Sequence, residues 1–157
     1  TGLRVATAGT PIPHREALSP RVKSLNYLAH ILAKIEGIHA NADEVLMLDS
    51  EGHVAEGSGQ NLFVVKNGAI RTPVAYAGIL KGVTRDVVIE LGRAAGYDVQ
   101  ETMLNRYDVY TADEAFFTGT ASEIIGIRQV DGRAIGNGKP GPITRDLRSR
   151  FQALVRS

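Results

Sequence analysis

Lys23 is the residue of this chain best suited to covalent chemistry with a carbonyl compound. It lies in the segment KSLNYLAHILAK, where a 3,4,3 spacing of apolar residues predicts one face of a helix over about Ser24 to Glu36, formed by Leu25, Leu28, Leu32 and Ile35. The partial positive charge at a helix N-terminus disfavours the ammonium form, so a lysine there is biased toward the neutral, nucleophilic amine. A solvated lysine ahead of an amphipathic helix is the alternative, and this segment alone does not exclude it.

The segment EGSGQN places a carboxylate, Glu56, directly before two glycines. Glycines at such positions let the backbone turn sharply or approach a ligand closely. Ser58 suggests a hydrolase nucleophile, but the motif G-x-S-x-G needs a glycine at position 56, and no His and Asp are placed to complete a triad. The segment therefore predicts a turn that presents a carboxylate.

Two further segments have features of anion sites. In GILKGVTRD, the pair Val83-Thr84 opens a predicted helix, and helix N-termini bind phosphates, although Thr84 could equally serve only as a helix cap. In FFTGTASEI, a strand ends in the small residues Gly119 to Ser122, whose backbone amides stay accessible. Neither segment is a Walker A loop.

The segments KSLNYL, EGSGQNLF, GILKGVTRD and TADEAFFTGTASEI together resemble the class IV aminotransferases, which are pyridoxal 5'-phosphate (PLP) enzymes of fold type IV. The resemblance is closest to the branched-chain amino-acid aminotransferases. It implies transamination of a branched-chain or related amino acid with a 2-oxo acid acceptor. It also implies that Lys23 holds PLP as a Schiff base and, once displaced, moves the proton between Cα and C4′.

The same resemblance gives roles to the other residues. Glu56 would face the pyridine nitrogen, because a carboxylate keeps that nitrogen protonated and the ring able to accept electrons. Tyr27 would hydrogen-bond the phenolic oxygen, and Leu80 would pack on the ring; a half-buried aromatic and a core leucine are the alternatives. The other cofactor contacts, the phosphate site among them, would come from Val83, Thr84, Gly119 and Thr120. The substrate α-carboxylate would meet Thr120, Ala121 and Ser122.

Other functions stay open at this point. Within the fold, they are a D-amino-acid or amine transaminase and aminodeoxychorismate lyase; outside catalysis, the alternative is a PLP-fold module for binding or assembly. Tyr27 and the Thr120 to Ser122 turn favour the branched-chain type, and the presence of both Lys23 and Glu56 favours an enzyme. Two departures, Gln60 in place of an acidic residue and Gly126 in place of a proline, concern the substrate more than the fold.

Composition limits the classes of protein that are possible. The 157 residues are 43% apolar, which suits one domain with a core, and 18 basic against 17 acidic residues give no field for nucleic acid or an anionic membrane. There is no cysteine, and the four histidines lack metal-binding spacing, so no metal site is expected and the histidines are interpreted as surface or structural residues. The charged residues Arg85, Asp86, Asp113 and Glu114 are expected to support the fold. No apolar run is long enough to span a bilayer, and we expect a cytoplasmic protein.

Strand patterns outnumber helix patterns. Strands are predicted at Leu3 to Ala8, Glu44 to Asp49, Asn61 to Lys66, Ala69 to Thr72, Val99 to Leu104, Ala115 to Thr118 and Ile124 to Val130. After the first helix, further helices are predicted from Val83 to a stop at Gly96 and from Ile143 to Val155, with a helical turn at Arg106 to Thr111. These elements predict an α/β (α+β) fold, with a mixed, largely antiparallel sheet curled toward a barrel.

The resemblance extends this picture to the whole chain. It implies that residues 1–157 form the C-terminal pseudo-barrel domain that binds PLP, with flanking helices, and that the small N-terminal domain of the family is absent. We expect the partners to be amino-acid and 2-oxo-acid substrates, the missing domain, and further copies of the chain in a homodimer or higher oligomer. Nucleic acid and membranes are not expected partners.

Overall fold

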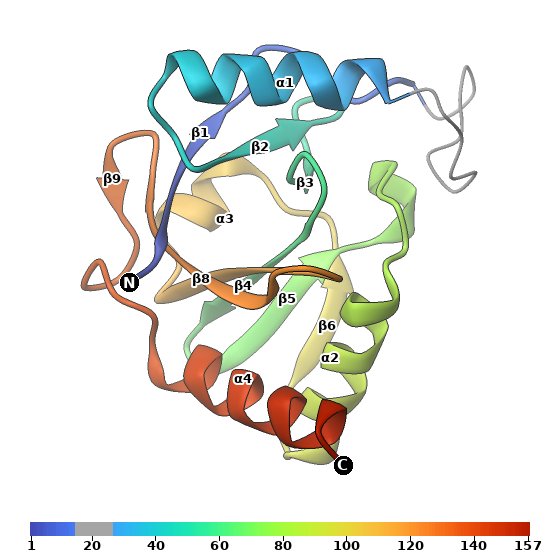
Figure 1. Ribbon diagram of the computed structural model, residues 1–157, viewed down its shortest axis with the longest axis vertical. Coiled ribbons are helices and arrows are strands. Elements are labelled where there is room, and N and C mark those ends of the chain that lie inside the picture. The colour runs from blue at the N-terminus through green and yellow to red at the C-terminus, as the bar shows by residue number, and fades with distance from the viewer. Residues whose placement is uncertain (15–26) are drawn as a thin grey trace.

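A closed barrel of six strands forms the centre of the computed structural model, which describes residues 1–14 and 27–157 (Figure 1). The ring runs in the order β3 (Val54–Glu56), β2 (Glu44–Leu48), β1 (Leu3–Thr7), β8 (Glu123–Val130), β7 (Glu114–Gly119) and β4 (Asn61–Lys66). A pairing between β3 and β4 closes the ring, and Glu56 opposite Asn61 is the residue pair that makes it.

Within the described residues, three further strands extend the sheet beyond this ring. They are β5 (Ala69–Pro73), which pairs with β4, β6 (Val99–Thr102), which pairs with β5, and β9 (Arg133–Ala134), which pairs with β8. Strand β1 runs parallel to β2 and β8, and β5 runs parallel to β6, while the other described pairings are antiparallel. The prediction of a mixed, largely antiparallel sheet curled into a barrel is confirmed.

Helices cover the barrel on two sides. Helix α1 (Leu28–His39) packs over β1 and β2 (Figure 1). Helices α2 (Val83–Ala94) and α4 (Pro142–Val155) pack against each other and against β7, and α4 also covers β8. The short helix α3 (Arg106–Tyr110) and the 3-10 turn η1 (Ala75–Ala77) lie in the connections.

Strand β4 shows how the sequence pattern builds the core. Successive side chains of a strand point to opposite faces of the sheet. Leu62 and Val64 belong to the cluster of apolar residues inside the barrel. Phe63 and Val65 belong to the cluster between the barrel wall and helices α2 and α4, where the ring of Phe63 stacks on Phe116 at a centroid distance of 5.0 Å. Both faces of this strand are therefore buried, which explains its continuous apolar run.

Helix α1 differs from its prediction at both ends. The predicted start, at residue 24, lies outside the described residues; within them the helix begins at Leu28, with Tyr27 as N-cap, and it continues to His39. The prediction that this helix ends at Glu36 is wrong, because Gly37 does not stop it. Gly37 is buried inside the helix because α1 lies close to β2: a Cβ at this position would lie 2.5 Å from Cγ1 of Val45.

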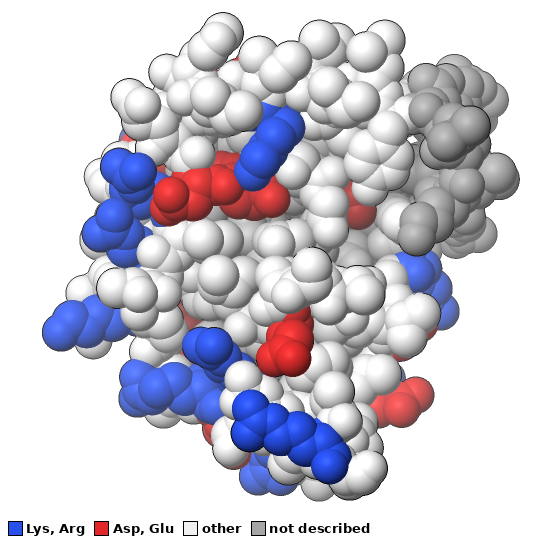
Figure 2. Space-filling view, viewed as in Figure 1, with Lys and Arg blue, Asp and Glu red and all other residues white. Residues whose placement is uncertain are grey.

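The large apolar residues of α1 lie on its outer face. The small residues Ala33 and Gly37 are buried toward the barrel, whereas the exposed fractions on the other side are 61% for Leu28, 52% for Ile31, 45% for Leu32, 44% for Ile35 and 61% for Ile38. We call these five residues the α1 stripe. In Figure 2 the surface over α1 is mostly uncharged. Contiguous apolar patches of this kind mark contact surfaces on proteins.

Other boundaries also depart from the predictions. Strand β3, which ends at Glu56, and strand β9 were not predicted, because two or three residues carry no readable alternation. The strand predicted over 99–104 ends at Thr102. The predictions of α2, α3 and α4 agree with the structure to within two residues.

Buried charges support the fold, as expected for residues outside the predicted site. Arg85 is fully buried on α2, and its Nη2 donates to the Pro73 carbonyl at 2.9 Å and to Glu101 Oε1 at 2.8 Å. Glu114 is buried at the start of α4, where its carboxylate accepts the N–H of Ile143 at 3.1 Å and both the N–H and the hydroxyl of Thr144, at 2.8 and 2.7 Å. Glu114 thus caps α4 from a neighbouring strand.

We expect Glu114→Gln to lower the free energy of unfolding by about 2 kcal/mol, because a neutral amide replaces a carboxylate that accepts three hydrogen bonds at a helix N-terminus. Urea unfolding at neutral pH measures the loss. Glu90→Gln is the control, since Glu90 is exposed on α2, and it should leave the midpoint nearly unchanged. Equal midpoints for the two variants would show that the Glu114 cap does not stabilise α4.

Candidate functional site

A hollow of about 270 Å³ opens at the edge of the barrel where β3 ends and β4 begins. This volume lies close to the roughly 300 to 1,000 Å³ typical of small-molecule sites. Every described residue predicted from the sequence to contact the cofactor lines it: Tyr27, Glu56, Leu80, Val83, Thr84, Gly119 and Thr120. Residues far apart in the chain therefore meet at one place, as their predicted roles require.

Two of the described residues predicted for the site, Ala121 and Ser122, are not among those that line the hollow. Lys23 lies outside the described residues. Ala121 and Ser122, predicted to receive a substrate carboxylate, occupy the tip of the hairpin that joins Gly119 of β7 to Glu123 of β8. Only Thr120 of that turn reaches the wall of the hollow.

Glu56 is held by hydrogen bonds to both oxygens of its buried carboxylate. Oε1 lies 3.1 Å from Nε2 of His30, and Oε2 accepts the backbone N–H of Leu80 at 3.1 Å. The side-chain amide of Asn61 lies 3.5 Å from Oε2 and donates a shorter bond, of 2.9 Å, to the Leu80 carbonyl. A carboxylate with these contacts has one fixed orientation in the wall of the hollow.

Burial raises the pKa of Glu56 above its ordinary value, and the hydrogen bond and charge of His30 act in the opposite direction. The pKa of Tyr27 is also raised, first by burial and then by the negative charge of Glu56. Desolvation of a charged group in a hollow with convergent polar groups is characteristic of functional sites.

His30 is a site residue that the sequence did not reveal; it was expected to be a surface or structural histidine. Its side chain is only 11% exposed, and its ring lies 4.8 Å from the ring of Tyr27. A signal was present, because positions three apart lie on the same side of a helix and Tyr27 was already a candidate. No spacing rule, however, links His30 with Glu56.

The N-terminus of α2 forms another part of the wall. Gly82 is the N-cap, and no side chain caps the helix, so Thr84 does not serve as the cap that was its alternative role. The first N–H groups of a helix have no partners within it, and the positive end of the helix dipole favours an anion. Val83, Thr84 and Gly82 line the hollow at this point.

Unpartnered polar atoms border the same hollow. The hydroxyl oxygen of Thr118 and the side-chain carbonyl oxygen of Gln60 are buried, and neither has a hydrogen-bond partner in the part of the chain that the structure describes. Such groups are rare in native proteins unless a ligand or water satisfies them. They indicate that the hollow accommodates a polar molecule.

Ser58 has a structural role. Its hydroxyl donates to Oε1 of the buried Glu44 at 2.6 Å and its N–H to the same oxygen at 3.2 Å, which anchors the turn after β3. This arrangement agrees with the exclusion of a hydrolase nucleophile. Among the described lysines, Lys81 lines the hollow, whereas Lys34 and Lys66 donate to backbone carbonyls elsewhere.

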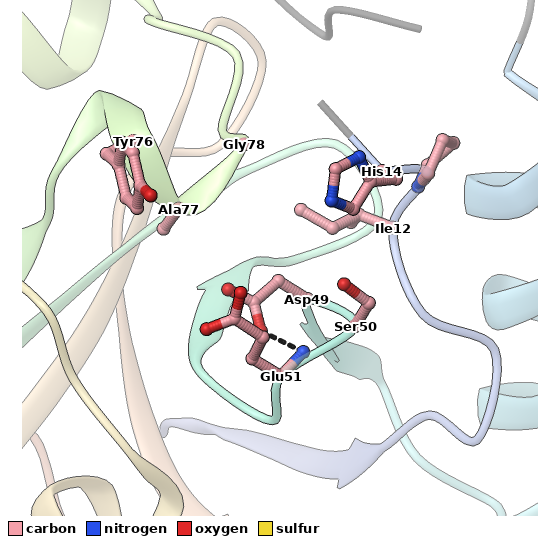
Figure 3. Close-up of a pocket in the computed structure, with 9 residues that line it drawn as sticks. Ile12, His14, Asp49, Ser50, Glu51, Tyr76, Ala77 and Gly78 are labelled. Carbon is pink, nitrogen blue, oxygen red and sulfur yellow. Dashed lines mark hydrogen bonds between the residues drawn. The ribbon is translucent and has the colours of Figure 1, made fainter. Parts of the chain in front are cut away.

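A smaller hollow next to η1 is lined in part by Asp49 and Glu51, whose polar groups hold a local turn (Figure 3). Asp49 accepts the N–H groups of Glu51 and His53, each at 2.9 Å, and lies 3.2 Å from the ring Nδ1 of His53. The carboxylate therefore stabilises its own turn. In residues 1–14 and 27–157, no group of three or more His, Asp or Glu side chains is placed to hold a metal ion, and no helix is long and apolar enough to cross a membrane.

Comparison with known proteins decides the family. Residues 3–130 match the family model for amino-transferase class IV. The chain belongs to the class IV aminotransferase family. It is 48% identical to a putative branched-chain-amino-acid aminotransferase of Methanocaldococcus jannaschii and 45% identical to the branched-chain-amino-acid aminotransferase of Pseudomonas aeruginosa. Each match covers 98% of this chain, but only 53% and 50% of the two relatives.

Solved structures of this aminotransferase family have the same fold. The branched-chain amino acid aminotransferase of Thermobaculum terrenum, in its PLP-form, has a TM-score of 0.95 at 39% identity, over 99% of this chain and 51% of its own. The branched-chain aminotransferase of the archaeon Thermoproteus uzoniensis, with norvaline, has a TM-score of 0.94 at 38% identity, over 98% and 51%. The predicted pseudo-barrel of fold type IV is confirmed, and the chain spans about half the length of these relatives.

The directions of the pKa shifts predict that pH changes the contributions of two glutamates to fold stability in opposite ways. Because the pKa of Glu56 is raised in the fold, the unfolded chain ionises first, so this group weakens the fold as pH rises above its ordinary pKa. Glu101 hydrogen-bonds Arg85, which lowers its pKa, so it stabilises the fold above its ordinary pKa and loses that effect as pH falls through the lowered value.

Urea midpoints measured at about pH 4 and about pH 8 test this, because the range spans the ordinary glutamate pKa. The urea midpoint of Glu56→Gln, taken relative to that of the wild type, should be higher at the upper pH than at the lower pH. The midpoint of Glu101→Gln, taken in the same way, should be lower at the upper pH than at the lower pH. The same sign for both variants would contradict the assigned causes.

Proposed function

We propose that this chain forms the PLP-binding half of an enzyme that transfers the amino group between a branched-chain or related amino acid and a 2-oxo acid. The observation that carries the proposal is the composition of one hollow, in which a buried carboxylate and an uncapped helix N-terminus meet. PLP needs both features, since it has a basic ring nitrogen and a phosphate dianion. When bound, PLP supplies an electron sink for the bond broken at the substrate Cα.

The donor and acceptor groups of the hollow suit this cofactor. Glu56 would accept a hydrogen bond from the protonated pyridine nitrogen, a role that suits a buried carboxylate whose orientation is fixed by His30 and Leu80. The N–H groups of Val83 and Thr84, with the Thr84 hydroxyl, would bind the phosphate at the start of α2. Gly119 and Thr120 would complete that site from the end of β7.

Tyr27 and Leu80 would hold the ring between these two ends. Tyr27 lies at the N-cap of α1 and lines the hollow, and its hydroxyl would hydrogen-bond the phenolic oxygen of the cofactor. Leu80 is half-buried at the wall, where its backbone fixes Glu56 and its side chain would contact the ring. The core role considered for Leu80 is not favoured, because it lies at the edge of the hollow.

Lys23 would bind PLP covalently and then move the proton at the substrate Cα. This role rests on the resemblance of KSLNYL to the family motif, and the described start of the next segment supports it, since Tyr27 lines the hollow four residues later. The substrate carboxylate would bind at the Thr120, Ala121 and Ser122 turn, of which Thr120 lines the hollow. Ala121 and Ser122 follow it at the tip of the same hairpin.

A complete substrate site needs more polypeptide than this chain. The relatives are about twice as long, so we propose that a second domain closes the hollow and shields the reacting atoms from water. We also propose a homodimer or higher oligomer, and the exposed α1 stripe is the described surface that a second copy would cover. The chain alone would then bind PLP weakly and turn over slowly.

Borohydride reduction of the PLP-loaded protein, followed by peptide mapping, tests the proposal. The adduct should map to Lys23, and Lys23→Ala should abolish it while circular dichroism shows the same fold. In the full enzyme the substitution should slow turnover at least about 10² to 10⁴-fold, the usual contribution of an acid–base group. Lys81→Ala is the matched control, because Lys81 is the described lysine that lines the hollow. An adduct on Lys81 would refute the assignment of Lys23.

A further inference from the structure

His30 lies next to the hollow with its side chain 11% exposed, but it is not among the described residues that line the wall. Its Nε2 lies 3.1 Å from Oε1 of Glu56, and the other ring nitrogen, Nδ1, is buried without a hydrogen-bond partner among the described residues. A buried, unpartnered nitrogen is costly. The His30 ring occupies this position although its Nδ1 makes no hydrogen bond with a described residue.

The ring of His30 contacts two residues of the proposed cofactor site at once. One side faces Tyr27, with 4.8 Å between ring centroids and 36° between ring planes, and one nitrogen reaches Glu56. Tyr27 precedes α1 and Glu56 ends β3, so His30 connects two elements of the hollow that no described backbone pairing joins.

Resting on the proposed function, we propose that His30 is a positioning residue, which donates from Nε2 to Glu56 and thereby holds that carboxylate ionised and aimed at the pyridine nitrogen. The backbone N–H of Leu80 and the amide of Asn61 contact the other oxygen, Oε2. His30 is the described group that contacts Oε1, so its loss leaves half of a buried carboxylate unpartnered.

The surroundings of Glu56 contain few groups that could replace His30. Among the described residues of α1 and its N-cap, the titratable groups facing Glu56 are His30 and Tyr27, and the charge on Glu56 opposes ionisation of Tyr27. Strand β4 contributes the neutral amide of Asn61, and the segment before α2 contributes the Leu80 N–H. Lys81 lines the same hollow but is exposed. Without His30, burial would favour the protonated acid.

The direct test is a carbon-13 NMR titration of the side-chain carboxyl of Glu56 in the cofactor-free protein, with the signal identified by its loss in Glu56→Gln. His30→Leu removes the donor and keeps an apolar side chain of similar size, so the titration midpoint should move to higher pH. His30→Gln keeps an N–H donor near the position of Nε2 and should restore the wild-type midpoint. His39→Leu, at an exposed histidine of the same helix, is the control and should change nothing.

PLP binding gives a second readout. His30→Leu should weaken PLP binding about tenfold, since a hydrogen bond to a charged group contributes on the order of 1.5 kcal/mol or more. If His30→Leu does not fold, His30→Asn takes its place, because its shorter amide cannot reach Glu56 from the same backbone. Thermal unfolding of each cofactor-free variant separates this effect from a general loss of stability.

Two results have distinct meanings. An unchanged Glu56 midpoint in folded His30→Leu or His30→Asn would overturn the positioning role, whether or not PLP binds. Failure of the wild-type protein to bind PLP would overturn the proposed function, and with it the proposed role of the contact between His30 and Glu56. The titration would still show whether the two side chains are coupled.

Discussion

The contact between Glu56 and Asn61 is the point on which the barrel and the hollow both depend. It is the residue pair through which β3 meets β4 and closes the ring of strands. A carboxylate buried at such a joint must be hydrogen-bonded, because an unpartnered buried charge would destabilise the fold by several kcal/mol. His30, Leu80 and Asn61 meet this requirement, and in doing so they bring α1, the segment before α2 and β4 to one place.

Asn61 also links the carboxylate end of the hollow to its anion-binding end. Its side-chain amide donates to the Leu80 carbonyl at 2.9 Å, and its Oδ1 lies so close to Gly82 that a Cβ there would be at 2.5 Å. Gly82 is the N-cap of α2, so the start of that helix is placed relative to Glu56 through one side chain. Behind the helix, the buried Arg85 ties α2 to the end of β5 and to β6. The two ends that PLP would require are thus held by one connected set of contacts.

Much of this could be predicted from the sequence, because it depends on local pattern. The continuous apolar run of β4 and the helical periodicity and turn residues of α2 and α4 predicted those elements to within two residues. The cofactor residues were predicted from motif resemblance, and the structure brings the described ones together around the hollow.

What could not be predicted depends on contacts between distant segments. Periodicity shows which residues of α1 share a face, but the small residues Ala33 and Gly37 decide that the face with large apolar residues points outward. His30 and Glu56 are 26 positions apart, and no spacing rule encodes their hydrogen bond. Strand β3 has three residues, too few for a pattern, although it carries the central carboxylate.

The central claim is that Glu56 is held as an ionised partner for the cofactor's ring nitrogen. The most direct measurement is the nitrogen-15 chemical shift of the pyridine nitrogen of isotopically labelled PLP bound to the protein. The account predicts the shift of a protonated nitrogen in the wild type and of an unprotonated nitrogen in Glu56→Gln, whose amide cannot stabilise the positive charge. The same shift in both proteins would contradict it and give the role of pyridine partner to another group.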